Sequence, residues 1–329
     1  MITNSEFNQK LIIAINYYIP EKNKQLDLLL DLFYLGKEAA YRRLRGDVPF
    51  SFTEACIISN HLGISLDNIV GMSAKEHSIM YELVTPSAEV KSIEELSSYY
   101  HNLIYNEYLS AFEKYVDRPN LDIMSANNMI PHSLLLPYKY LSRFNAFKWI
   151  YQFQRGMSCT FAEVDMKPEM SSRLKDLGSK LSENSEFTFI FGRYIFITFI
   201  KQILHFRRLQ LILDEDIVVM KDELLDLISK LEQKAIEGIN PGDKRVWIYL
   251  SNVEFECNYT YLKCMGEERT FMHIFQIHTL SSADLQVCQM TRDWIESLKK
   301  YSTLISVSGE MERSLFFEEQ RKYLEKLIA

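Results

Sequence analysis

A cluster of basic side chains within one short stretch is the clearest candidate for chemistry in this sequence. Residues 37–45 read KEAAYRRLR and carry four Lys or Arg residues against one Glu, a local net charge of +3. Arg guanidinium groups pair bidentately with guanine edges, and both Lys and Arg neutralise phosphates. A helix that presents these groups is narrow enough to enter the major groove of DNA. The segment therefore favours non-covalent nucleic-acid recognition.

The residues around this stretch predict a compact bundle of short helices that positions it. Apolar residues recur at helical spacing in residues 6–18 and again in residues 26–33. Gly46 is typical of the end of a helix, and the Ser-Phe-Thr-Glu sequence at 51–54 is a capping box that opens another helix. We expect Ala40 and Leu44 to face the bundle core and the charged residues of 37–45 to face outward.

The residues that we expect at the nucleic-acid interface lie on and just before this basic helix. They are Gly36, Lys37, Glu38, Tyr41, Arg42, Arg43 and Arg45. Lys37, Tyr41 and Arg42 are expected to reach base edges. Arg43 and Arg45 are expected to contact phosphates, which position the helix without reading sequence. The backbone N–H of Gly36 is expected to contribute at the helix N-terminus.

Five features follow one another along residues 29–67: a short helix, a tight turn, a basic helix, a loop and closing helices. In order they are residues 29–34, 35–36, 37–45, 46–49 and 57–67. This succession resembles the Cro-like (XRE, lambda-repressor-like) helix-turn-helix domains of bacterial transcription regulators. The resemblance covers roughly residues 5–71 and implies an all-α DNA-binding domain in which residues 37–45 form the recognition helix.

Two positions depart from the family pattern. Tyr34 stands where the family usually has a Gly, which adopts a positive φ without steric cost. Leu30 stands where a small residue usually permits close approach of helices. We expect the turn to be locally different and the module to retain DNA binding.

The remainder of the chain predicts a second, larger domain. Amphipathic periodicity is lost in residues 71–90, which contain a Thr-Pro-Ser sequence. The predicted organisation is a helix-turn-helix domain at 1–72, a linker at 73–90 and a helical α+β dimerisation or sensor domain at 91–329.

The expected fold class is mainly α, with a small antiparallel sheet near the C-terminus of the larger domain. One long helix is predicted from residue 92 to Pro119, and the apolar stretches 133–154 and 187–213 predict buried helices. From residue 246 the apolar period becomes two, and residues 253–277 predict a β-hairpin.

Charge and cysteine content limit the partners and the compartment. The chain has 37 Lys and Arg against 44 Asp and Glu, a net charge of −7. Residues 1–71 contribute seven basic and eight acidic residues, a net −1, which leaves −6 for the rest. Nucleic-acid binding must therefore come from a local patch. The five cysteines contain no C-x-x-C pair and fit a cytoplasmic protein with reduced thiols.

The sequence gives no positive signal for a membrane segment, a metal, a cofactor or an active site. The most apolar stretch, residues 187–200, is short and contains Arg193, so we interpret it as a buried helix or strand and expect no membrane partner. The side chains that would form a zinc site are Cys257, Cys264, His273 and His278. Their odd spacings alternate between strand faces, so no metal is expected. Common phosphate-binding and nucleophile motifs are absent from the sequence, so we expect no cofactor and no enzyme.

The predicted function is a sequence-specific DNA-binding transcription regulator whose larger domain dimerises or senses a signal. The expected partners are double-stranded DNA, a second copy of the chain in a homodimer, and a small-molecule or peptide effector. Two other functions fit the same residues. One is a protein-interaction module whose helix-turn-helix no longer reads DNA, and the other is an enzyme fused to a DNA-binding domain.

Overall fold

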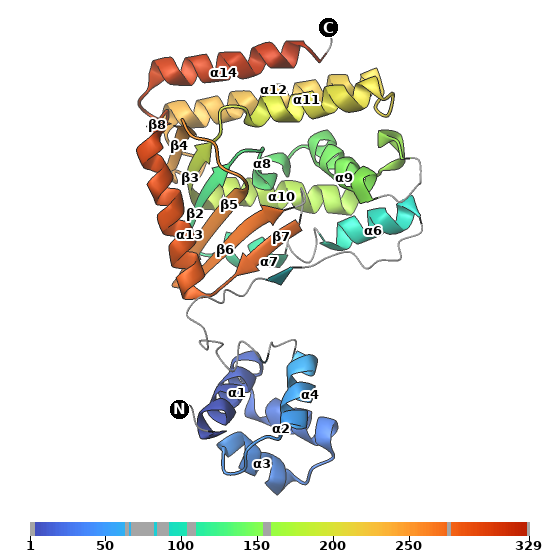
Figure 1. Cartoon of the computed structure of the whole chain (residues 1–329), viewed down its shortest axis with the longest axis vertical. Coiled ribbons are helices and arrows are strands. Elements are labelled where there is room, and N and C mark those ends of the chain that lie inside the picture. Colours follow the sequence, from blue (N-terminus) through green and yellow to red (C-terminus); the bar gives the residue numbers. More distant parts are fainter. Residues whose placement is uncertain are drawn as a thin grey trace. The chain divides into compact units, whose positions relative to one another are not determined.

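The computed structural model divides into two compact units, Met1–Ile79 and Met80–Ala329 (Figure 1). The structure describes residues 4–62, 66, 82–83, 92–103, 110–153, 159–274 and 278–327. No helix of these described residues is long and apolar enough to cross a membrane.

The first unit is a bundle of short helices. Its described helices are α1 (Asn4–Tyr18), α2 (Lys22–Phe33), α3 (Lys37–Arg45) and α4 (Phe52–Leu62). Leu11, Ile15, Leu26, Leu29, Ala40 and Ile58 form the buried core, to which each of these helices contributes. The predicted capping box is confirmed, because the Ser51 N–H donates to Glu54 Oε2 and the Glu54 N–H donates to Ser51 Oγ. A local sequence signal therefore accounts for the start of α4.

The second unit is built on an eight-stranded sheet of described residues, with the order β1-β7-β6-β5-β2-β3-β4-β8. The strands are β1 (Glu82–Leu83), β2 (Leu121–Asn127), β3 (Ser185–Phe191), β4 (Val246–Ser251), β5 (Asn258–Cys264), β6 (Glu267–Ile274), β7 (His278–Ser282) and β8 (Ser302–Leu304). Strands β2, β3 and β4 pair in parallel, and the flanking pairs are antiparallel.

Helices lie on both faces of this sheet (Figure 1). They are α6 (Ile93–Leu103), α7 (Ser110–Val116), α8 (His132–Leu135), α9 (Lys139–Phe153), α10 (Pro168–Asn184), α11 (Ile195–Arg208), α12 (Asp214–Glu237), α13 (Leu285–Leu298) and α14 (Glu310–Glu325), with 3-10 turns η2 (Phe161–Glu163) and η3 (Lys299–Tyr301). Helix α13 packs against one face, where Met124 and Ile190 are buried. The other face carries Ile123, Phe187 and Val246 and joins the main core with α9 to α12.

The predicted fold class is wrong for this unit, because the sheet is large and mixed rather than small and antiparallel. The prediction contained no strand at residues 121–127 and assigned residues 187–213 to a helix. Both β2 and β3 are buried on their two faces, so their sequences lack the alternation that marks a half-exposed strand. An apolar run without alternation does not distinguish a buried strand from a buried helix.

Several predicted boundaries also differ from the structure or lie outside the described residues. The hairpin is present as β5 and β6, although β5 begins at Asn258. The expected long helix from residue 92 is described as α6 and α7, with residues 104–109 between them outside the described set. The predicted linker at 73–90 also lies outside it, except for Glu82 and Leu83, which form β1 and pair with β7.

Candidate nucleic-acid interface

The turn between α2 and α3 contains a left-handed residue, although no glycine supplies it. Tyr34 adopts φ 49° and ψ 37°, and its N–H donates to the Leu30 carbonyl over 3.1 Å. Gly36 then has extended backbone as the N-cap of α3. The expectation of a locally different turn is therefore corrected: Tyr34 itself adopts the conformation that Gly favours. Leu30 packs against the small core and is accommodated there.

Helix α3 is fixed by its apolar side and by its C-terminal end. Ala40 is fully buried in the core of the first unit, and Leu44 packs against it. At the end of the helix, Gly46 has a φ of 84° and donates its N–H to the Arg43 carbonyl over 3.0 Å. Because Ala40 and Leu44 hold one side against the core, the opposite side of the helix faces solvent.

The exposed side of α3 carries most of the predicted interface residues. They are Lys37, Glu38, Tyr41, Arg42 and Arg45, and the N-cap Gly36 is exposed with them. Counted from Lys37, the other four helix residues lie one, four, five and eight positions later. This spacing places all five on one side of an α-helix. Among the described residues, Lys37 and Arg42 have no hydrogen bond or ion pair that occupies their charged groups. Both side chains are therefore available to an anionic partner.

Arg43 is placed differently from the other predicted interface residues. Its guanidinium forms an ion pair with Glu54 of α4 over 2.9 Å, and the two side chains are only 18% and 15% exposed. Arg43 Nη1 also approaches the Ala39 carbonyl at 3.4 Å. This geometry commits Arg43 to joining α3 to α4 rather than to a phosphate outside the bundle.

Glu54 was not among the predicted site residues beyond its capping role. Burial opposes its charge, but hydrogen bonds from Ser51 and Arg43 outweigh burial and lower the pKa of Glu54. The capping box is visible in the sequence because its members are three residues apart. The partnership with Arg43 spans eleven positions and two helices, so no local pattern indicates it.

Arg45 keeps its position on the exposed side but has acidic neighbours. Its Nε donates to Asp47 Oδ2 over 3.0 Å, and its Nη2 lies 3.4 Å from Glu38 Oε1. The hydrogen bond to Asp47 raises the pKa of Arg45 further, so the guanidinium is charged at any physiological pH. Exposed ion pairs of this kind contribute little free energy and can be exchanged for a phosphate contact.

Comparison with known proteins adds no assignment to this geometry. A scan of protein-family models, a search of curated proteins and a search of solved structures all find no match to the chain. The site is therefore defined by what its own residues present: a capped helix, packed on one side, with a basic and aromatic opposite side. Such a surface can bind a polyanion without forming or breaking a covalent bond.

Proposed function

We propose that the first unit binds double-stranded DNA by inserting α3 into the major groove, and that the chain is a sequence-specific DNA-binding transcription regulator. The observation that carries this proposal is the orientation of α3. Ala40 packs into the core while Lys37, Tyr41 and Arg42 face solvent. Two consecutive helical turns therefore present side chains that suit base edges and phosphates.

The roles of individual residues follow from their surroundings. Arg42 is on the exposed side, has no ion-pair partner among the described residues, and is assigned to a guanine edge. Lys37 lies in the first helical turn and Tyr41 one turn later, both within reach of bases. Arg45 is assigned to a phosphate, which replaces its exposed contacts with acids. Arg43 is excluded from the interface because Glu54 holds it.

Two copies of the chain are proposed to act on one DNA site. A single recognition helix contacts only a few base pairs, which is too small an interface for typical specific affinity. A dimer with two-fold symmetry would hold two α3 helices about 34 Å apart, one helical turn of DNA. The preferred site is then a pseudo-palindrome, and sedimentation of the full chain at micromolar concentration should give a dimer.

The experiment is selection of the full chain on random duplexes, followed by fluorescence anisotropy on the selected duplex. Arg42→Ala should weaken binding about 5- to 150-fold and relax preference at one base pair of each half-site. Arg45→Ala should weaken binding to all duplexes alike and reduce the salt slope by about one unit. The matched control is Arg208→Ala, which removes the same charge from an exposed helix end in the second unit and should leave the affinity unchanged.

Two results would contradict the proposal. If selection enriches no sequence, α3 does not read DNA, and the result favours the alternative that the first unit is a protein-interaction module. If Arg42→Ala and Arg208→Ala weaken binding equally, the protein binds DNA only through its general charge. Either result would remove α3 as the reader.

A further inference from the structure

A small cavity in the second unit opens at the edge of the sheet where β2 and β3 end. The residues lining it come from the segment after β2, from α8, α9 and α11, and from the start of β5: Met129, Ile130, His132, Asn145, Lys148, Ile195, Thr198, Phe199, Gln202 and Asn258. The space between these residues amounts to about 440 Å³ when the open solvent at its mouth is counted with it. The carboxyl ends of parallel strands are where ligands of α/β sheets usually bind.

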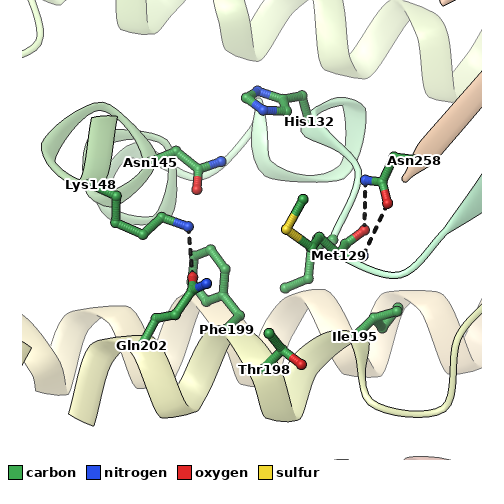
Figure 2. Close-up of a pocket in the computed structure, with 10 residues that line it drawn as sticks. Met129, His132, Asn145, Lys148, Ile195, Thr198, Phe199, Gln202 and Asn258 are labelled. Carbon is green, nitrogen blue, oxygen red and sulfur yellow. Dashed lines mark hydrogen bonds between the residues drawn. The ribbon is translucent and has the colours of Figure 1, made fainter. Parts of the chain in front are cut away.

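Lys148 is the unusual residue of this cavity. Its side chain is 8% exposed, and its Nζ donates to Gln202 Oε1 over 2.9 Å. The rings of Phe144 and Phe199 lie 5.1 and 4.8 Å from the Nζ atom. Figure 2 shows Lys148 and Asn145 extending from α9 toward the space that Gln202 and Phe199 border from α11. The amine is therefore held at the wall of the cavity.

No acid balances this buried amine within the described part of the chain. No Asp or Glu lines the cavity, and no ion pair joins Lys148 to a described carboxylate. Burial lowers the pKa of Lys148 to about 7. A buried amine in this situation either loses its proton or receives an anion from outside.

The other polar groups of the wall suit an anion of a particular kind. The amide of Asn145, which is 7% exposed, and the hydroxyl of Thr198 are neutral polar groups that also line the cavity. The side chain of Asn258 is occupied, since it bonds the backbone of Asn128 and Met129 and so fixes the loop after β2. The remaining wall is apolar, because Met129, Ile130, Ile195 and Phe199 form it.

We infer that this cavity binds a small organic monocarboxylate, with its carboxylate on Lys148 and Asn145 and its apolar part against Ile195 and Phe199. A single ammonium with neutral donors matches one negative charge, whereas a phosphate dianion requires more cationic groups. The apolar wall rewards a ligand with a short hydrocarbon part. This inference is independent of DNA binding by the first unit.

The experiment is isothermal titration calorimetry of the full chain with butyrate, accompanied by acetate and benzoate as smaller and larger carboxylates. At least one should bind with a Kd below about 1 mM at pH 7. The neutral analogue butyramide should bind at least about tenfold more weakly than butyrate, because it lacks the charge that pairs with Lys148.

Two variants distinguish binding in the cavity from attraction by the general charge of the protein. Lys148→Met keeps an unbranched side chain but removes the terminal amine, and it should weaken carboxylate binding at least about tenfold. Lys201→Met is the matched control, because Lys201 is exposed on α11, and it should bind as the parent does. Should Lys148→Met fail to fold, the comparison of butyrate with butyramide on the unaltered chain still decides the question.

Proton uptake gives a readout that a purely structural lysine would not produce. At pH 8 the free amine is largely neutral and the carboxylate complex favours the ammonium, so binding should take up about one proton. His132 is the other titratable side chain among the described cavity residues. Titrations in two buffers of different ionisation enthalpy measure the uptake.

Three outcomes would overturn the inference. The first is that none of the three carboxylates binds with a Kd below about 1 mM at pH 7. The second is that butyramide binds as tightly as butyrate. The third is that folded Lys148→Met retains the parent affinity.

Discussion

Arg42 in the first unit and Lys148 in the second are both basic side chains, and they lie in opposite environments. Arg42 is exposed on a helix whose other side packs into a small core. Lys148 is 8% exposed within the main core of the larger unit and has no carboxylate partner among the described residues. An exposed cation lowers the free energy of unfolding little and suits a large anionic surface. A buried amine without a carboxylate partner lowers it more and suits a small ligand that supplies the negative charge.

The sharpest test of this contrast is the pH dependence of the second unit. The pKa of Lys148 is lowered to about 7 in the folded chain and is ordinary, about 10.4, when unfolded. Between these values the unfolded state binds more protons, so the free energy of unfolding rises with pH through this window. Below pH 7 the full cost of burying the charged amine is present.

Lys148→Met should therefore be more stable than the parent near pH 6, by about 2–4 kcal/mol, and the difference should shrink toward pH 10. Urea unfolding followed by Trp fluorescence measures it. All three tryptophans, Trp149, Trp247 and Trp294, lie in the second unit and report on it alone. A pH-independent difference would mean that Lys148 keeps its charge when buried and would break the contrast.

Arg43 tests the first unit, because it is the cation of α3 that faces inward. Arg43→Met removes the partner of Glu54 and should lower the stability of this unit by about 1–2 kcal/mol. Hydrogen exchange of α3 and α4 peptides measures the loss. Arg45→Met breaks exposed contacts only and should cost less than about 0.5 kcal/mol.

The same pair predicts the acid response of the first unit. The pKa of Glu54 is lowered in the folded state, so its stabilisation is present above the ordinary Glu pKa and is lost as the pH falls through the folded value. Arg43→Met should reduce that acid-dependent loss. Equal acid sensitivity in parent and variant would show that Ser51 alone lowers the pKa.

The smallest expected effect is at the turn. Tyr34 adopts a positive φ with its side chain 95% exposed, so Tyr34→Gly should relieve backbone strain and lose almost no packing. We expect the free energy of unfolding of the first unit to rise by about 0.5–1 kcal/mol, as measured by hydrogen exchange. Tyr34→Ala keeps the strained conformation and is the control. A gain of equal size in Tyr34→Ala would place the cost in the tyrosine ring rather than in the backbone.

The structure of the first unit could be predicted from the sequence because its signals are local. The capping box at residues 51–54 and the left-handed Gly46 each involve atoms within a few residues of one another. Ala40 within a basic stretch indicated which side of α3 is buried. What these signals did not contain was the partner of Arg43, because Glu54 reaches it from a different helix.

Only the tertiary structure decided the sheet and the cavity of the second unit. The apolar run 185–200 contains both β3 and the start of α11, and the chain changes direction near Gly192, where a Cβ would lie 2.6 Å from Asn128 Oδ1. Alternation of apolar and polar residues indicates a strand with one buried face, so a strand buried on both faces does not show it. The sequence does not show that Lys148 is buried, because its side chain is the same as that of an exposed lysine. Its surroundings come from distant parts of the chain, which the parallel pairing of β2 and β3 helps to bring together.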